Sequence, residues 1–437
     1  MAVGPARPAR SAHPTGSRRP ARRSVLAAAA VAAPLGLVAT AGAPVARATG
    51  PTGRSTTFDL HCEVLDSGEQ VTTLVIDATR RGRLLAGDAL PSTFSVSVRG
   101  TNPVSGAVVV DTERTVTAVT VDRAGTVTIT LEHGYGVEGA STLDYLADEG
   151  RNVQLDLEYT VLQHSPLPAN GKGAGSAWLG ELTQGDLVSP EVDAFTSHVT
   201  DSGMNYRLFS PATRGRSRAL PLVIWLHGGG EGGIGEGGAV RYDNEVHLRA
   251  NRGALGPATA EAQEILGGAH VVAPQCTSAW MLDGPAFAPL VSEVIAEVQR
   301  TRRVDPDRIH VMGCSNGGYM TLKMVVENGG EFASAVPICG VVDTFYGSTD
   351  PLVSDAELAA IRTPTWLIAA ADDTTVDPQA NTVHAHELIE DSLLSLYDDV
   401  TYDGVSYPGH WSWIYAARND PRAEGESLWG WMAAQHR

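Results

Sequence analysis

The sequence predicts two folded parts, an all-β sandwich followed by a mostly parallel α/β sheet with helices on both faces. Two patterns predict this arrangement. Short Val- and Thr-rich runs of alternating polarity fill residues 55–163, and continuous apolar runs separated by helical segments fill residues 193–437. Of the 437 residues, 43% are hydrophobic and 19% are charged, so the chain can build a sizeable core in each part.

The first 48 residues form a separate segment with the layout of an export signal. They hold seven arginines and no acidic residue. The pair Arg22 and Arg23 precedes an apolar, Ala-rich run, and an A-x-A cleavage site ends at Ala48. We therefore predict a twin-arginine-type signal peptide over residues 1–48 and a secreted, extracellular protein. A disordered tail is the alternative, whereas a membrane anchor is disfavoured because Pro34 interrupts the short apolar run.

The charge balance limits the classes of partner. The formal net charge is −18, and removal of the arginine-rich signal would make the mature chain more acidic still. Nucleic acids and anionic membranes attract basic surfaces, so we expect neither as a partner. Histidine and cysteine spacings typical of metal sites are absent, and we expect neither metal nor cofactor. Export would permit disulfides among the four cysteines, and their pairing cannot be read from the sequence; a free, buried thiol is the alternative for all four and the favoured state for Cys314.

Residues 55–163 are predicted to form the β-sandwich. Short strand-like runs recur along this stretch and are separated by turn residues. The predicted strands cover residues 71–76, 94–98, 107–110, 115–121, 126–131 and 153–161. No cluster of catalytic residue types stands out among them. Residues 164–192, which contain Pro166, Pro168 and several glycines, are predicted to be a linker.

Strands and helices alternate from residue 193 to residue 437. Leu220–Leu226 is a continuous apolar run, as expected for a parallel strand that is buried on both faces. Further strands are predicted at 194–199, 205–210, His270–Pro274, 308–312, 333–338 and 364–370. Helices are predicted at 289–300 and 316–327, the second of which is followed by an Asn-Gly-Gly stop.

The segment VMGCSNGGYM, residues 311–320, contains a G-x-S-x-G pattern centred on Ser315. The pattern alone is weak, because a glycine-rich chain supplies such matches by chance. Its setting is more specific, since a predicted strand precedes Ser315 and a predicted helix follows it. A strand, a sharp turn and a helix are typical of a nucleophile elbow, in which small neighbours allow a strained backbone. We therefore predict Ser315 as a nucleophile and Cys314 as a packing residue beneath the turn.

A serine hydroxyl needs a base, and the base needs an orienting acid. His410 lies in a loop after a predicted last strand at 400–405 and is the candidate base. Asp373 follows the strand at 364–370 with D-x-x-V spacing and is the candidate acid, with Asp372 as the alternative. The order serine, acid and histidine along the chain is that of the α/β-hydrolase fold.

Acyl transfer also needs donors for the oxyanion that develops on the substrate. The H-G-G-G tract at residues 227–230 follows the first long apolar strand, where glycines let backbone N–H groups approach a ligand. Gly229 is the first choice for this donor and Gly228 is the second. The N–H of Asn316, directly after the nucleophile, is the expected partner donor.

Three tryptophans are candidates for a substrate pocket. Trp411 stands next to His410 in the sequence and is the best candidate. Trp280 and Trp413 are the others, and for both of them core packing is the favoured role.

Several stretches resemble one group of enzymes. The stretches that carry this resemblance are PLVIWLHGGGEGG, VVAPQC, VDPDRIHVMGCSNGGYM, FASAVPICG and GHWSWIYAARNDP. They are similar to secreted α/β-hydrolase esterases of the prolyl-oligopeptidase-like and polyhydroxybutyrate-depolymerase-like group, in particular carboxylesterases with an N-terminal immunoglobulin-like domain. The resemblance covers residues 193–437 well and the sandwich more weakly.

The resemblance implies an α/β-hydrolase fold, an immunoglobulin-like sandwich before it, and Ser315, Asp373 and His410 as a catalytic triad. Two positions depart from the pattern of the group. Asn316 stands where many relatives have Met or Gln, which leaves the backbone donor intact. The acid turn has Ala residues at 369–370 where His-Gly is usual, which bears on the choice between the two aspartates.

The leading hypothesis is a secreted serine carboxylesterase acting on a small-molecule or polymer-linked ester. The alternatives are a serine peptidase of the prolyl-oligopeptidase-like class and a non-catalytic protein that binds carbohydrate or another surface. True peptidases of that class usually add a β-propeller, for which about 110 residues of sandwich are too few. The sandwich itself is a candidate for holding substrate, for capping the site or for forming homo-oligomers.

Overall fold

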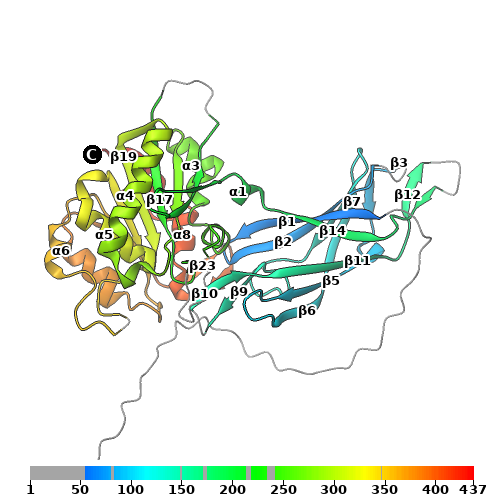
Figure 1. The fold of residues 1–437 in the computed structure, drawn as a ribbon, viewed down its shortest axis with the longest axis horizontal. Coiled ribbons are helices and arrows are strands. Elements are labelled where there is room, and N and C mark those ends of the chain that lie inside the picture. Colours follow the sequence, from blue (N-terminus) through cyan, green and yellow to red (C-terminus); the bar gives the residue numbers. More distant parts are fainter. Residues whose placement is uncertain are drawn as a thin grey trace, which may run out of the picture.

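The structure is a computed structural model that describes residues 55–79, 83–147, 150–170, 175–212, 218–233, 242–345 and 347–437. It has an all-β part and an α/β part, which lie one after the other along the longest axis (Figure 1). The predicted export signal at residues 1–48 lies outside the described residues. Among the helices that the structure describes, none is both long enough and apolar enough to cross a membrane.

The all-β part is built mainly from two facing sheets. The larger has the strand order β14-β1-β2-β8-β7-β4 and the smaller has the order β11-β5-β6. All neighbouring strands in them are antiparallel except β1 and β14, which are parallel. The bounds are β1 Thr56–Leu65, β2 Gly68–Asp77, β4 Gly87–Ala89, β5 Phe94–Thr101, β6 Val108–Arg114, β7 Val116–Val121, β8 Thr126–Leu131, β11 Asp156–Gln163 and β14 Leu182–Val188. Two small sheets add β9 Leu143–Leu146 and β10 Arg151–Gln154, and β3 Arg83–Leu84, β12 Leu167–Asn170 and β13 Ser176–Ala177.

Alternating polarity explains why these strands pack as a sandwich. In β5, Phe94, Val96 and Val98 are buried, and the residues between them are more exposed. The buried residues join Leu60 of β1 and Ile129 of β8 in one hydrophobic cluster shared by both sheets. The two-sheet arrangement agrees with the predicted sandwich, and its relation to immunoglobulin domains stays a prediction.

The α/β part is organised around one eight-stranded sheet with the order β15-β16-β18-β17-β19-β20-β21-β22. Strands β15 and β16 are antiparallel to their neighbours, and the other six run parallel. The bounds are β15 Thr196–Val199, β16 Asn205–Phe209, β17 Leu220–Leu226, β18 His270–Pro274, β19 Val304–Cys314, β20 Ser334–Ile338, β21 Trp366–Ala370 and β22 Leu393–Tyr397.

Strand β17 shows why its apolar run is continuous. Leu222 and Ile224 belong to one hydrophobic cluster, and Val223 and Trp225 belong to another, so both faces of the strand are covered. Helices α4 and α5 pack in the first cluster, and α3 and α9 pack in the second. The helices are α1 Pro190–Asp193, α2 Val246–Arg249, α3 Ala260–Ile265, α4 Gly284–Thr301, α5 Asn316–Asn328, α6 Asp355–Ala360, α7 His384–Leu388, α8 Trp413–Ala417 and α9 Leu428–Ala434.

Three predicted elements differ from the structure. The predicted linker at 164–192 contains strands β12, β13 and β14 and helix α1, and β14 is an edge strand of the larger β-sheet. The predicted last strand at 400–405 is a separate hairpin, β23 Val400–Tyr402 and β24 Val405–Tyr407, and the edge of the main sheet is β22. Helix α4 begins at Gly284 rather than 289, because the Asp283 side chain caps it by accepting from the Ala286 N–H.

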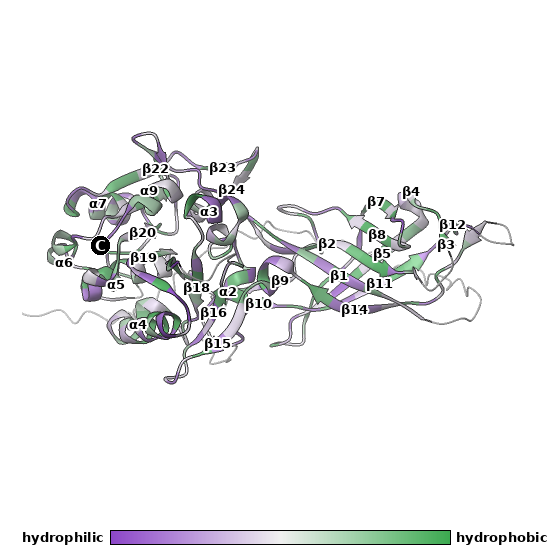
Figure 2. Ribbon diagram, turned by 90° about the horizontal axis from the view of Figure 1, so that it is seen from above, coloured by the Kyte–Doolittle hydropathy of each residue, from purple (hydrophilic) through white to green (hydrophobic). Residues whose placement is uncertain are grey.

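Ionic contacts join the two parts in the region where α2 meets β10 (Figure 2). Arg249 Nη1 of α2 lies 2.5 Å from Glu69 Oε1 of β2, and the Glu69 side chain is fully buried. Thr142 Oγ1 donates a 2.7 Å hydrogen bond to the other oxygen of Glu69. Arg418 pairs with Asp66 at 2.8 Å close by. The α/β part is therefore anchored to the sandwich by one ion pair with a fully buried carboxylate and by a second, partly exposed ion pair.

We predict that Arg249→Met strongly destabilises the protein, because it leaves the Glu69 carboxylate buried without its cation. Removal of one partner from a buried ion pair costs about 3–5 kcal/mol of unfolding free energy. The matched control is Arg99→Met, which breaks a surface pair with Asp111 whose side chains are 50% and 64% exposed. That loss should stay below about 1 kcal/mol. Guanidinium denaturation measures both variants, and equal small losses would contradict the prediction.

Candidate active site

Ser315 occupies the sharp turn between strand β19 and helix α5. Its φ is 54° and its ψ is −114°, a conformation that a residue with a side chain rarely adopts. The Ser315 N–H donates a 2.8 Å hydrogen bond to the carbonyl oxygen of Ile338, the last residue of β20. The turn is therefore tied to the carboxyl edge of the sheet, where open α/β sheets bind ligands.

Three glycines make this turn sterically feasible. A Cβ atom would lie 1.9 Å from the Leu226 carbonyl oxygen at Gly317 and 2.5 Å from it at Gly313. At Gly318 a Cβ atom would lie 2.6 Å from the Ile338 carbonyl oxygen. Real Cβ atoms essentially never approach another heavy atom closer than 3.0 Å. The glycines of the sequence pattern are thus required by close packing against β17 and β20.

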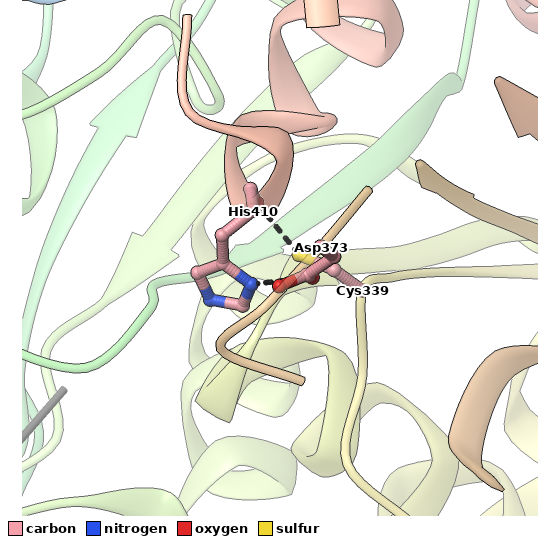
Figure 3. Close-up of side chains that lie close together, drawn as sticks. All are labelled: Cys339, Asp373 and His410. Carbon is pink, nitrogen blue, oxygen red and sulfur yellow. Dashed lines mark hydrogen bonds and ion pairs between the residues drawn. The ribbon is translucent and has the colours of Figure 1, made fainter. Parts of the chain in front are cut away.

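Two hydrogen bonds join Ser315, His410 and Asp373. His410 Nδ1 lies 2.7 Å from Asp373 Oδ2, and His410 Nε2 lies 2.9 Å from Ser315 Oγ. A carboxylate can only accept, so Nδ1 carries the proton and Nε2 is free to accept from the serine hydroxyl. His410 lies in a short 3₁₀ turn, Gly409–Trp411, and Asp373 follows β21 (Figure 3). The structure thus brings together the three residues that the sequence predicted as nucleophile, base and acid.

The second oxygen of Asp373 explains the D-x-x-V spacing. Asp373 Oδ1 accepts hydrogen bonds from the N–H groups of Thr375, at 2.8 Å, and Val376, at 2.9 Å. The side chain is fully buried, and its two oxygens are satisfied by the turn and by the imidazole. Asp372 is exposed and faces Gly409, where a Cβ atom would lie 2.2 Å from Asp372 Oδ1. Of the two aspartates, the structure therefore places Asp373 in contact with the histidine.

The glycine tract forms a loop beside the elbow. Among the described residues, nothing would lie within 4 Å of a Cβ atom at Gly229, whereas one at Gly228 would lie 3.3 Å from Cys314 Sγ. Gly228 therefore faces the interior, and no described residue crowds Gly229. Helix α5 begins at Asn316, so the Asn316 N–H belongs to the first turn and has no partner within the helix. The Asn316 side chain has a role that the sequence did not reveal, because its Oδ1 accepts from the Met281 N–H at 2.9 Å.

His227 and Trp280 support this loop from beneath. His227 Nδ1 lies 2.8 Å from the Gly228 carbonyl oxygen, and its Nε2 accepts from the Cys276 N–H at 2.9 Å. This pattern requires a neutral ring, and burial lowers the pKa of His227 to about 4. Trp280 is fully buried, and its Nε1–H donates to the His227 carbonyl oxygen at 3.1 Å. The prediction of Trp280 as a pocket residue is therefore wrong, because its ring is enclosed in the core.

Trp411 lies in a partly exposed group of aromatic rings. Its ring centroid is 5.9 Å from that of Trp413 and 6.0 Å from that of Tyr407. A third ring, Tyr135, comes from the all-β part and lies 5.7 Å away. The sequence did not indicate Tyr135, because its place in this aromatic group depends on how the two parts meet.

Metal-binding residue types meet at one point among the described residues. The donor atoms of Cys339, Asp373 and His410 lie within 4.8 Å of one another (Figure 3). The Cys339 thiol donates to the His410 carbonyl oxygen at 3.4 Å, and burial beside Asp373 raises the pKa of the thiol far above its usual value. Asp373 and His410 are hydrogen-bonded to each other. The proximity of the three donor atoms is therefore accounted for by this hydrogen bond and by a thiol that packs beside it. All four cysteines, whose pairing the sequence left open, are free and buried.

The all-β part also reaches the glycine loop. The N–H of Asn152, in β10, donates a 2.7 Å hydrogen bond to the carbonyl oxygen of Gly230. Gly230 has a φ of 88°, and a Cβ atom there would lie 3.2 Å from the Cα of Arg151. The glycine loop is thus held between the main sheet and the β9–β10 hairpin. The close approach of the hairpin backbone to Gly230, together with the positive φ, requires a glycine at this position.

The mostly parallel sheet and the sharp turn at Ser315 together define an α/β-hydrolase fold. Comparison with a solved structure supports this assignment of the fold. The chain is similar to a protein whose structure is described as "Crystal Structure of a Thermostable Esterase", with 24% identity and a TM-score of 0.69. The match covers 87% of this chain and 99% of that chain, a share larger than the α/β part alone. The predicted α/β-hydrolase fold is confirmed.

Two sequence comparisons add local similarity. A model of the Prolyl oligopeptidase family matches residues 291–355, which include the elbow and helix α5. "Putative esterase NocK" of Nocardia uniformis subsp. tsuyamanensis is 28% identical over 208 residues, which are 43% of this chain. The matched region spans 58% of the length of that relative.

We predict that Gly317→Ala destabilises the elbow, because the new Cβ would collide with the carbonyl oxygen of Leu226. Overpacking costs about 1–3 kcal/mol, and more where backbone must move, so we expect a loss of about 3 kcal/mol or a failure to fold. Gly330→Ala is the matched control, since a Cβ there meets nothing within 4 Å. Its effect should stay within about 0.5 kcal/mol. Chemical denaturation compares the two variants, and equal stability would contradict the steric account.

Proposed function

We propose that this protein is a serine esterase that cleaves carboxylic esters through an acyl-enzyme. The observation that carries the proposal is the hydrogen-bonded chain from Asp373 through His410 to Ser315, at a strained elbow beside a glycine loop. Such a chain activates a hydroxyl that is otherwise a weak nucleophile. The resemblance to esterases in fold and in local sequence supports an ester as the substrate.

In acylation, Ser315 Oγ attacks the ester carbonyl carbon while His410 Nε2 takes the hydroxyl proton. The substrate oxygen becomes negatively charged and accepts hydrogen bonds from the N–H groups of Gly229 and Asn316. The imidazolium of His410 then gives its proton to the leaving alkoxide as the C–O bond breaks. The alcohol departs, and the acyl group stays on Ser315.

In deacylation, His410 takes a proton from water, and the hydroxide oxygen attacks the acyl carbon. The bond to Ser315 breaks, the serine oxygen recovers the proton, and the carboxylic acid leaves. Asp373 keeps the ring oriented and stabilises the imidazolium in both steps, while its backbone donors keep its own carboxylate in place.

A panel of p-nitrophenyl esters with increasing acyl length tests the proposal. We expect ester hydrolysis that Ser315→Ala reduces to background. Asp373→Asn should lower kcat by about 10³- to 10⁴-fold, because the ring loses the carboxylate that fixes its tautomer. Asp372→Asn is the matched control and should retain nearly all activity. The absence of hydrolysis with every ester, or a larger loss for the Asp372 variant, would contradict the proposal.

A serine peptidase is the second candidate, favoured by the match of residues 291–355 to the Prolyl oligopeptidase family model. The same triad chemistry would cleave an amide. The all-β part, as far as the structure describes it, is built mainly from two facing sheets rather than from the repeated blades of a propeller. If a chromogenic peptide shows a higher kcat/KM than p-nitrophenyl acetate, the ranking of the two candidates is reversed.

We also propose that Trp411 and Tyr135 line the substrate-binding surface. The ring of Trp413 lies 5.6 Å from that of His410, and Trp411 and Tyr135 continue the aromatic group outward. Tyr135 remains 45% exposed, so packing leaves much of its surface available. The loop that carries Tyr135 is held by the buried side chain of Gln70. Gln70 Oε1 accepts from the Gly134 N–H at 2.8 Å, and Gln70 Nε2 donates to the Gly134 carbonyl oxygen at 3.1 Å.

We predict that Tyr135→Ala lowers kcat/KM for esters with an aromatic group. Loss of one ring contact is worth about 0.5–1.5 kcal/mol, which corresponds to a decrease of about 2- to 12-fold. Aliphatic esters should change less. Trp178→Ala is the control, because Trp178 is 46% exposed and follows β13, whose partner β12 lies at the far end of the all-β part (Figure 1). An unchanged ratio of 1-naphthyl acetate to ethyl acetate hydrolysis would exclude Tyr135 from the surface.

A further inference from the structure

Glu231 is a buried carboxyl group at the end of the glycine loop, directly after Gly230. The residue is only 5% exposed. Its Oε1 lies 3.4 Å from Asn251 Nδ2, a long hydrogen bond, and its Oε2 has no hydrogen-bond partner among the described residues. Buried charges need close pairing, so a negative charge at this position would be poorly compensated.

The titratable groups that face Glu231 are neutral. His227 Nδ1 lies 3.9 Å from Glu231 Oε2, but this nitrogen is engaged with the Gly228 carbonyl oxygen and the ring is uncharged. Cys314, on β19, is a buried thiol whose pKa is raised by burial and by the nearby Glu231. Arg151, on β10, meets the loop through its main chain. No cation on these elements therefore contacts the carboxyl group.

The carboxyl group faces the backbone of the loop rather than the substrate side. A Cβ atom at Gly228 would lie 3.5 Å from Glu231 Oε2, with Cys314 Sγ at 3.3 Å on the same side. Burial raises the pKa of Glu231 to about 8, and the N–H of Gly228 partly opposes that rise. The side-chain direction at Gly228 thus points toward Glu231, while a Cβ atom at Gly229 would meet no described residue within 4 Å.

We propose that Glu231 is a positioning residue that keeps its proton at neutral pH and holds the Gly228 peptide inward, leaving Gly229 as the oxyanion donor of the loop. The inference rests on the proposed esterase function. When the carboxyl group ionises, a buried negative charge lies beneath the loop and opposes the negative charge that develops on the substrate oxygen. Ester hydrolysis therefore decreases as pH rises through the range in which Glu231 loses its proton.

The pH dependence of kcat/KM between pH 6 and pH 10 tests this proposal. Glu231→Gln keeps the size and a hydrogen-bonding amide but remains neutral at every pH. We expect wild-type activity to fall above about pH 8, toward tenfold per pH unit, whereas Glu231→Gln keeps a plateau. Glu264→Gln, an exposed residue of α3, is the matched control and should follow the wild type.

Thermal unfolding gives a readout that does not depend on ester hydrolysis. The folded protein retains a proton on Glu231 that the unfolded chain releases above about pH 4.5. The Tm of the wild type should therefore decline relative to that of Glu231→Gln between about pH 5 and pH 8, and the difference should be constant at higher pH.

The two readouts separate the possible failures. If wild type and Glu231→Gln show the same pH dependence of kcat/KM and of Tm, the proposal is overturned. If no variant hydrolyses any ester while the Tm difference follows pH as stated, the esterase assignment fails and the proton on Glu231 is supported. A plateau in Glu231→Gln together with the Tm difference supports the complete proposal.

Discussion

The close packing of residues 313–318 between the ends of β17 and β20 is the constraint on which the site depends. The Leu226 carbonyl oxygen occupies the space where Cβ atoms at positions 313 and 317 would lie, and the Ile338 carbonyl oxygen fixes the Ser315 N–H. The strained φ of Ser315 is therefore imposed by two strands that are themselves buried on both faces. The hydroxyl is placed before any substrate arrives, and the histidine, the acid and the glycine loop are positioned at the same edge of the sheet.

Two buried carboxyl groups near this edge have opposite surroundings. Asp373 receives two backbone N–H groups and the imidazole, an environment that suits a negative charge. Glu231 receives one long amide contact, an environment that suits a neutral acid. The all-β part takes part in the same arrangement, because Asn152 fixes the Gly230 carbonyl group and Tyr135 extends the aromatic surface. The site is thus shaped by both parts of the chain.

The sequence predicted those features that local chemistry determines. Strands Leu220–Leu226 and His270–Pro274 were located to the residue because burial on both faces produces continuous apolar runs. Edge strands β14 and β22 were missed because their half-exposed residues lack that signal. The D-x-x-V spacing selected Asp373 with Asp372 as the alternative, and the backbone turn that this spacing forms places Asp373 against His410. Trp280 and Trp411 are the same residue type, so only packing could separate a core ring from a surface ring.

Reaction with a fluorophosphonate probe tests most directly whether Ser315 is an activated nucleophile. The account predicts one covalent adduct per chain, located by peptide mass spectrometry on Ser315 and lost when the protein is unfolded before the reagent is added. A folded protein that gains no adduct, or an adduct of the same stoichiometry in Ser315→Ala, would contradict it.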